Sequence, residues 1–442
     1  MSTPPATEGE LVPQQPEHVG LGERVAWLVV VGGGLLVQVL LTISGVISAR
    51  LLGVEGRGEI ALVAAVSLMG AQLTLGGSLP VAVTKQLAER GLTARDGLRG
   101  LGRRWSLLTI GLLVPFGGLL VLLHGDPGQP YVWWLGLLVV LLAVENVAIR
   151  LVGASMLGEQ SPLTRIAVAT LLPQSCVTVG LVVLFVLQRE STALVVASIM
   201  AAGLLVGLVA SLALLKAPTG DEDARLSEPE VWRVTRANYL AAVGPIDGLG
   251  LDRTLVGAIL GTSVLGLYAA AVALASLAGM LGSGLATVLL PRLAAVQGDP
   301  DAERRLVRRW LVRGALTIGA VTAVVTVVSR PVIELAFGQA FSDAALIAHW
   351  LVPAIGILGF RRLLVAVLQA RDRGSLASWV ELTLTPALVL AIVVAALLDS
   401  VQGVGVAMFC VALLSVSALS VAVLRTSPTR VAEGRRSRPA LY

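Results

Sequence analysis

The chain has 442 residues, of which 56% are hydrophobic and 14% are charged, and its formal net charge is +5. Soluble domains carry about 25% charged residues, and a mean hydropathy of +0.86 is more than a soluble core could accommodate. Composition therefore excludes a soluble protein and predicts a polytopic membrane protein. Cys176 and Cys410 both lie in apolar runs, so neither a disulfide framework nor a Cys-x-x-Cys metal site is available.

The chain begins and ends with polar segments. The first of these, residues 1–24, is rich in Glu and Pro and has no Lys or Arg before Arg24. This pattern is not the basic start of a secretory signal, and it predicts a disordered tail. Residues 425–442 are basic. We interpret them as a cytoplasmic tail that lies over anionic lipids, in preference to a nucleic-acid site.

Twelve stretches are apolar enough to cross a membrane, for which a helix needs about 20 residues. An N-lobe, residues 25–216, holds the first six, at 25–48, 58–79, 106–123, 132–157, 163–187 and 192–215. A C-lobe, residues 237–424, holds the other six, at 237–260, 264–290, 311–329, 344–370, 376–398 and 402–424. The acidic segment between them, residues 217–236, is predicted to be a cytoplasmic linker.

The connections between these spans alternate between basic and non-basic composition. With both termini and the even-numbered connections on one side, that side holds all but five of the 33 Lys and Arg. Basic connections stay in the cytoplasm, so we expect both termini to be cytoplasmic. The five on the outer side are Arg50, Arg57, Arg189, Arg253 and Arg330.

The second half of the chain repeats the first. Residues 49–65 align with residues 257–273, so that Gly53 matches Gly261 and Gly58 matches Gly266. "RRW" precedes the third span of each half, and "RLVGASMLGEQ" from Arg150 parallels "RLLVAVLQARD" in the tenth span. Each repeat has an even number of helices, so the halves share one orientation, and a binding site is expected between them near the midplane.

Ionisable residues interrupt the predicted spans, although a charge at the bilayer centre costs about 3 kcal/mol or more. They are Arg50, Glu145, Arg150, Asp247, Asp252, Arg253, Arg361 and Arg362. Long arginine side chains can reach the headgroups, and Glu145 can pair with an arginine as structural support. Asp247 is too short to do the same, so we expect it to face a water-filled cavity or a charged partner.

The seventh span holds three charges that a regular helix would not point in the same direction. Around such a helix, Asp252 lies about 140° and Arg253 about 240° from Asp247. Proline removes a backbone hydrogen bond and glycine weakens a helix. We therefore predict a bent or unwound hinge in this span, at Pro245, Gly248 and Gly250.

Three segments resemble the MOP superfamily, and within it the polysaccharide-biosynthesis (Wzx-like) flippases: "ARLLGVEGRGEIALVAAV", "LDRTLVGAILGTSVLGLYAAAVAL" and "VLLPRLA". The resemblance covers residues 25–425. It implies an all-α membrane protein of twelve helices in two pseudo-symmetric lobes around a V-shaped cavity. It also implies a transporter, not an enzyme, which moves an undecaprenyl-diphosphate-linked oligosaccharide to the outer leaflet of a bacterial cytoplasmic membrane by alternating access.

A diphosphate is anionic, and arginine binds phosphate oxygens in bidentate fashion. For this cargo we expect cavity residues that bind substrate, namely Arg253, Arg361, Arg362, Arg150, Arg50 and Asp252. Asp247 and Glu145 are expected to couple transport to an ion or to pair with an arginine. We expect no cofactor, metal or nucleic acid. The expected partners are the lipid-linked glycan, membrane lipids, and the glycosyltransferases and polymerase of a polysaccharide pathway, with the protein itself a monomer.

Three other functions compete with this one. A multidrug and toxin extrusion (MATE) exporter has a related fold, but its cationic cargo would be repelled by cavity arginines. A lipid II flippase usually has fourteen spans. A membrane glycan polymerase or glycosyltransferase needs a sizeable outer loop with acid, base or metal ligands, and none of the outer connections here is long.

The predicted orientation can be tested by labelling single cysteines in intact cells with a membrane-impermeant thiol reagent. Cysteines placed at Gly128 and Gln402 should react from outside, whereas cysteines placed at Gly97 and Gly298 should react only after permeabilisation. Labelling of Gly97 or Gly298 from outside would show that the chain is inserted the other way round.

Overall fold

A computed structural model describes residues 21–124, 128–188, 191–217, 226–242, 244, 249–296, 299–371, 373–398 and 400–426. These residues form helices joined by short turns. In chain order the elements are α1 (Leu21–Ala71), η1 (Gln72–Gly76), α2 (Leu79–Arg90), α3 (Ala94–His124), α4 (Pro130–Gly158), α5 (Leu163–Val186), α6 (Ala193–Ala213), α7 (Glu228–Ala242), α8 (Leu251–Ala295), α9 (Pro300–Phe337), η2 (Gln339–Phe341), α10 (Ala344–Ala370), α11 (Gly374–Leu397) and α12 (Val401–Arg425). Both terminal tails predicted from the sequence lie mostly outside the described residues.

Two of the long helices fold back on themselves at a glycine. Gly53 in α1 has φ 71° and ψ −169°, and Gly261 in α8 has φ 86° and ψ 173°. In α8 the Tyr268 hydroxyl donates to Oδ2 of Asp252 at 2.6 Å, across sixteen residues that would span about 24 Å in a straight helix. Each helix therefore has two antiparallel arms, residues 21–52 and 54–71 in α1, and residues 251–260 and 262–295 in α8.

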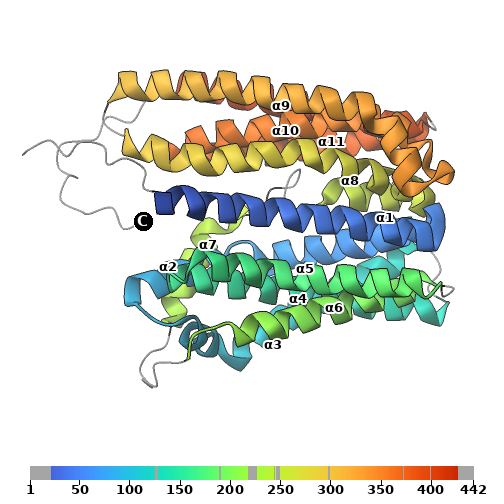
Figure 1. Ribbon diagram of the computed structural model, residues 1–442, viewed down its shortest axis with the longest axis horizontal. Coiled ribbons are helices and arrows are strands. Elements are labelled where there is room, and N and C mark those ends of the chain that lie inside the picture. The colour runs from blue at the N-terminus through green and yellow to red at the C-terminus, as the bar shows by residue number, and fades with distance from the viewer. Residues whose placement is uncertain are drawn as a thin grey trace, which may run out of the picture.

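Ten helices among the described residues are long and apolar enough to cross a membrane. Two of them, Gly32–Thr74 and Leu251–Leu290, contain the reversals and so supply two arms each. Figure 1 shows the N-terminal half, in blue and green, beside the C-terminal half, in yellow to red, with α1 against α8. The predicted fold class, an all-α membrane protein of two pseudo-symmetric six-helix lobes, is confirmed.

Helix α7 ends at Ala242 and α8 begins at Leu251; between them only Gly244, Leu249 and Gly250 are described, and these three are not helical. Helix α7 packs through Val231 and Val234 on α2 of the N-lobe. The Tyr239 hydroxyl also donates to the Leu73 carbonyl at 2.6 Å. The boundary expected at residue 237 therefore falls inside a helix that is attached to the N-lobe.

The lobes cross at a pair of glycines. A Cβ atom on Gly58 would clash with the carbonyl oxygen of Thr262, and one on Gly266 would clash with the carbonyl oxygen of Val54. The repeat aligns Gly58 with Gly266 and Val54 with Thr262, so the contact is reciprocal, as a pseudo-twofold axis requires. Small residues allow membrane helices to approach this closely.

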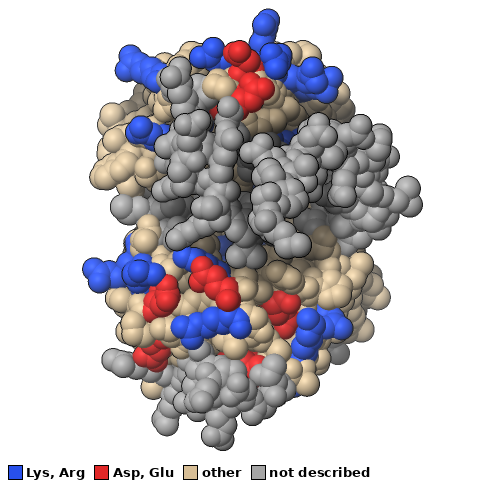
Figure 2. All heavy atoms as spheres, turned by 90° about the vertical axis from the view of Figure 1, so that its left-hand side faces the viewer, with Lys and Arg blue, Asp and Glu red and all other residues tan. Residues whose placement is uncertain are grey.

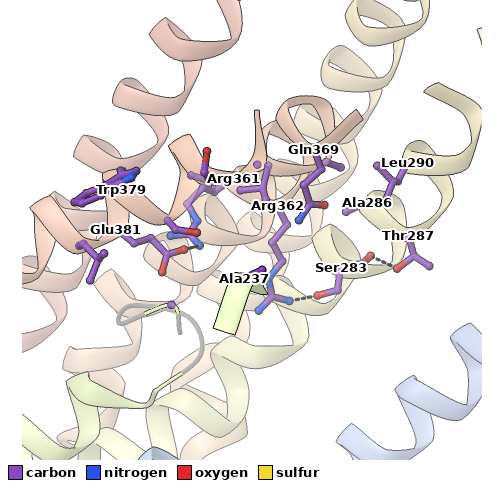
Figure 3. A pocket seen from close by; sticks show the side chains of 18 residues that line it. Ala237, Ser283, Ala286, Thr287, Leu290, Arg361, Arg362, Gln369, Trp379 and Glu381 are labelled. Atoms are coloured by element: carbon purple, nitrogen blue, oxygen red, sulfur yellow. Dashed lines mark hydrogen bonds and ion pairs between the residues drawn. The ribbon is translucent and has the colours of Figure 1, made fainter. Parts of the chain in front are cut away.

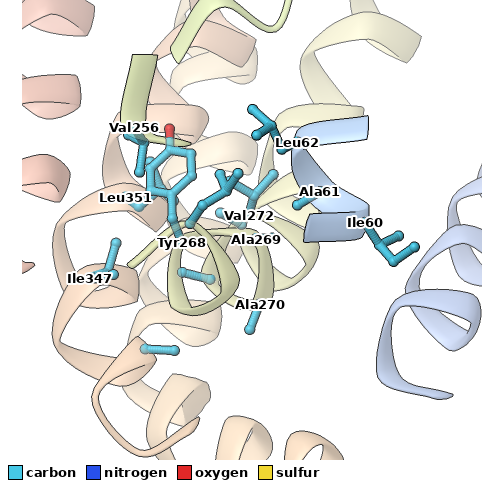
Figure 4. Close-up of a cluster of buried hydrophobic side chains, with 14 of the residues drawn as sticks. Ile60, Ala61, Leu62, Val256, Tyr268, Ala269, Ala270, Val272, Ile347 and Leu351 are labelled. Atoms are coloured by element: carbon cyan, nitrogen blue, oxygen red, sulfur yellow. The ribbon is translucent and has the colours of Figure 1, made fainter. Parts of the chain in front are cut away.

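The core of the molecule surrounds this crossing. Tyr268 is fully buried in it and lies beside Val256 and Leu351 (Figure 4). Because Val256 and Tyr268 come from opposite arms of α8, and Leu351 from α10, the cluster joins the hairpin to the rest of the C-lobe. The buried tyrosine hydroxyl needs a partner, which Asp252 supplies.

A second contact joins the lobes at the end where the two hairpins reverse, which we call the reversal end. Arg50, at the end of the first arm of α1, donates from Nε to the Ala336 carbonyl at 2.7 Å and from Nη2 to the Leu335 carbonyl at 2.5 Å. The carbonyls at a helix C-terminus lack partners within the helix and attract cations. Arg50 thus joins the N-lobe to the end of α9.

The glycine crossing predicts a specific loss of stability. Gly266→Ala should lower the melting temperature of the detergent-purified protein by several degrees, since overpacking costs about 1–3 kcal/mol. Gly284→Ala is the matched control, because a Cβ on Gly284 meets nothing within 4 Å and alanine favours a helix. Equal melting temperatures for the two variants would contradict the close crossing.

The Arg50 contact predicts that the reversal end opens when the side chain is removed. In a variant without native cysteines, spin labels at Glu55 and Gln339, both exposed and on opposite lobes, should show more long distances after Arg50→Ala. Arg330→Ala is the control, since Arg330 pairs within its own helix with Glu334 at 2.9 Å. An unchanged distance distribution in Arg50→Ala would show that this contact does not hold the lobes together.

Candidate functional site

The described residues line three cavities between or beside the lobes. Two of them, of about 220 and 240 Å³, adjoin each other because both are lined by Gln38, Arg253, Val272 and Ser276. Their walls come from both lobes, and we call the two together the central cavity. A third, of about 1010 Å³, is lined by α8, α10 and α11 of the C-lobe, and also by Ala237 of α7 and by Gly244. We call it the side cavity.

The two charged residues in the first turn of α8, Asp252 and Arg253, have different surroundings. Gly250, with φ 62°, precedes the helix, and Arg253 lines both parts of the central cavity. Asp252 also reaches the wall of the smaller part, but its carboxylate accepts the hydroxyl of Tyr268. Pro245, Gly248 and Asp247 lie outside the described residues, so the hinge and the coupling role of Asp247 stay predictions.

Arg57 is a cavity residue that the sequence analysis missed. It was assigned to an outer connection, but the chain reverses at Gly53 alone, so Arg57 already lies in the first turn of the second arm. It lines the central cavity together with Arg253, and its buried Nε has no hydrogen-bond partner among the described residues. The available signal was its position next to Gly58, which the repeat pairs with Gly266.

The two adjacent arginines of α10 have different surroundings. Arg361 is 3% exposed and forms an ion pair with Glu381 of α11, inside the C-lobe. Arg362 donates to the Ser283 hydroxyl of α8 (Figure 3). Arg362 lines both the central and the side cavity, whereas Arg361 lines the side cavity alone. Of this pair, Arg362 is therefore the one that faces the space between the lobes.

Arg150 and Glu145 lie within the N-lobe on α4. Nη1 and Nη2 of Arg150 donate at 2.7 and 3.0 Å to the amide oxygen of Gln72, in the amide orientation that satisfies both groups. Glu145 is 2% exposed, and neither carboxylate oxygen has a hydrogen-bond partner in the described part of the chain. Neither residue lines the cavities described above.

Arg50 is also absent from the walls of these cavities. The sequence placed it among the substrate-binding residues, but the structure places it at the reversal end, bonded to main-chain carbonyls of α9. Its long side chain reaches across to the other lobe instead of into the space between them.

The central cavity is electrostatically positive. Its ionisable wall residues are Arg57, Arg253, Arg362 and Asp252. The larger part has Arg57 and Arg253 and no carboxylate among its described wall residues, and the two guanidinium charges repel each other. An anion between them would relieve that repulsion and supply acceptors for their N–H groups. The arrangement is suited to binding phosphate or carboxylate groups.

The matches to known proteins agree with this architecture. Residues 46–346 match the model of a family described as "Polysaccharide biosynthesis protein". No curated protein is similar enough to be matched to the chain.

Several solved transporter structures share the fold. One is described as the inward-facing conformation of a multidrug resistance MATE family transporter of the MOP superfamily, with TM-score 0.69, 13% identity, and coverage of 88% of this chain and 94% of that chain. The outward-facing conformation of such a transporter has TM-score 0.59, 15% identity, and coverage of 91% and 97%.

A third is a MOP superfamily transporter from Pyrococcus furiosus, whose description says that the reverse polarity of its binding pocket suggests a different function. It has TM-score 0.60, 14% identity, and coverage of 90% and 94%. At these identities the likeness concerns the fold, while the family match covers more than half of the sequence. The chain belongs to the polysaccharide biosynthesis protein family, and it adopts the fold of MOP superfamily transporters.

Proposed function

We propose that the protein is a flippase, which moves an undecaprenyl-diphosphate-linked oligosaccharide from the inner to the outer leaflet of a bacterial cytoplasmic membrane. The observation that carries the proposal is the pair Arg57 and Arg253 in the central cavity. Neither has an acidic partner within the described residues. Charges buried in a membrane are costly unless they face water or a partner, and a diphosphate would provide that partner during transport.

The family match supports an anionic cargo that takes part in polysaccharide biosynthesis. In that process a saccharide on a lipid diphosphate combines a negative headgroup with an apolar tail that stays in the bilayer. A cavity between two lobes can accept the headgroup while the tail remains outside. Arginine is suited to the task, since its planar fork matches two phosphate oxygens at once.

Alternating access is the transport mechanism that we propose. The lobes are joined at the reversal end, through Arg50 and through the Gly58 and Gly266 crossing. The fold is also closer to the inward-facing than to the outward-facing MATE structure. Lys and Arg are abundant on the opposite end, which Figure 2 shows, and in the predicted orientation this end faces the cytoplasm. In the proposed cycle the reversal end opens while the opposite, Lys- and Arg-rich end closes.

A MATE-type exporter of cationic drugs is the main alternative, because solved MATE structures share the fold. The positive charge of the central cavity disfavours a cationic cargo, because three arginines in its wall would repel a cation. The binding pocket of the Pyrococcus furiosus neighbour is described as having reverse polarity, which suggests a different function for that protein. A lipid II flippase would also take an anionic cargo, but we prefer a polysaccharide precursor because of the family match.

We propose transport without catalysis, and therefore a partnership with the glycosyltransferases that build the precursor and the polymerase that uses it. The described residues contain no cluster of three or more His, Cys, Asp or Glu suited to a metal ion. The energy source is a separate question. Glu145 is buried without a hydrogen-bond partner among the described residues. We propose it as a coupling group, in addition to Asp247.

Removing a central arginine should reduce transport without reducing the amount of protein. In proteoliposomes that contain lipid-linked oligosaccharide, Arg57→Gln and Arg253→Gln should each slow flipping at least tenfold, because a charge-assisted hydrogen bond contributes about 1.5–3 kcal/mol. Arg57→Lys and Arg253→Lys should recover part of the rate, since they keep the charge but lose the planar fork. The readout is the fraction of cargo that becomes accessible to an external glycosidase.

Arg330→Gln is the matched control, because Arg330 is exposed and pairs with Glu334 on its own helix. It should flip cargo at the wild-type rate. Wild-type rates in both central variants would mean that the cargo is held by neutral contacts, and the anionic-cargo proposal would then be wrong. Tighter binding of a cationic drug by the wild type than by Arg253→Gln would instead support the exporter.

A further inference from the structure

The side cavity has no part in the proposed contact with the diphosphate, although its volume of about 1010 Å³ is the largest of the three. It is lined by the second arm of α8, the end of α10 and the start of α11, with Ala237 of α7 on the remaining side. Pockets for organic ligands commonly measure about 300–1,000 Å³. The side cavity is therefore large enough for a ligand of several rings.

The wall of the side cavity is polar, and its described charged residues are Arg361, Arg362 and Glu381. Hydroxyl, amide and indole groups line it, from Ser283, Thr287, Gln369, Ser375, Ser378 and Trp379. The one acidic residue on the described wall, Glu381, forms an ion pair with Arg361. Small apolar residues such as Ala286 and Ala366 fill the spaces between the polar groups. Such a wall offers both donors and acceptors, and the charge that Arg361 and Glu381 do not balance between them is that of Arg362.

Several of these polar groups are free to bind a ligand. Gln369, Ser375 and Ser378 make no side-chain hydrogen bond to any of the described residues. Gln369 is exposed, next to Arg362 on the same helix (Figure 3). An acyl or polyprenyl chain in this cavity would leave these groups unpaired, at a cost of about 1–3 kcal/mol each. The chemistry of the wall thus disfavours lipid tails as its ligand.

Arg362 borders both the side cavity and the proposed diphosphate site. It lines the side cavity and also the smaller part of the central cavity, where Arg253 lies. A ligand whose anionic group is held by Arg253 would have to pass the Arg362 side chain to reach the side cavity. This route runs towards α11, where Trp379 is 58% exposed.

We propose that the side cavity is the subsite for the saccharide part of the cargo. Sugars present many hydroxyl groups and also apolar ring faces, which correspond to the serine, threonine and glutamine groups and to the indole of Trp379. The inference rests on the proposed function and adds that different residues bind the two parts of the cargo. Arg57 and Arg253 hold the diphosphate, and α8, α10 and α11 contact the glycan.

The test compares two probes on purified protein in nanodiscs. The first is undecaprenyl diphosphate without sugar, and the second is the pool of undecaprenyl-diphosphate-linked glycans extracted from cells that express the protein natively. The double variant Gln369→Ala/Ser378→Ala should bind the glycan-bearing probe about tenfold more weakly than the wild type. It should bind the bare diphosphate with unchanged affinity. Thr383→Ala is the matched control, as an exposed hydroxyl on α11 that bonds to its own helix.

The outcomes separate this inference from the proposed function. Arg253→Gln should weaken the binding of both probes. If the double variant binds the glycan-bearing probe as tightly as the wild type does, the side cavity is not a saccharide subsite, while the diphosphate site stands. Equal weakening for both probes would also overturn the subsite, because it would show a general structural effect. If the wild type binds neither probe, the proposed function fails and the subsite with it.

Discussion

The contact between Gly58 and Gly266 is the constraint on which the rest of the structure depends. Each glycine faces a main-chain carbonyl of the other lobe, so the second arms of the two hairpins touch backbone to backbone. No larger residue fits at either position without moving the helices apart. Because the contact is reciprocal, it sets the axis that relates the lobes.

The sharp reversals at Gly53 and Gly261 make this contact possible. Both residues have positive φ, near 71° and 86°. Residues other than glycine rarely adopt such backbone angles. A longer connection would have left Arg57 outside the membrane. With the reversal confined to a single residue, Arg57 enters the helix and lines the central cavity together with Arg253. The geometry of the hairpin thereby produces the positive charge of the proposed binding site.

The pseudo-symmetry preserves the frame of the lobes but not their chemistry. In the N-lobe Arg150 reaches from α4 to Gln72, and in the C-lobe Arg362 reaches from α10 to Ser283. Both arginines thus connect equivalent helices. Arg362 borders two cavities, whereas Arg150 borders neither of them. We propose that the lobes divide the work, with the saccharide bound by the C-lobe and a buried carboxyl, Glu145, in the N-lobe available for coupling.

The sequence by itself determined the membrane class, the two six-helix lobes, and the repeat that matches Gly53 with Gly261. These features follow from local hydropathy, from glycine positions and from spacing, all of which are properties of the chain alone. Only the tertiary structure decided the direction of each arginine. Arg361 and Arg362 are neighbours in one helix, yet one is buried in an ion pair and the other faces the cavities. Arg50 and Arg57 lie seven residues apart, on opposite sides of a reversal. Such differences depend on how each helix is rotated against its partners, and hydropathy does not encode that rotation.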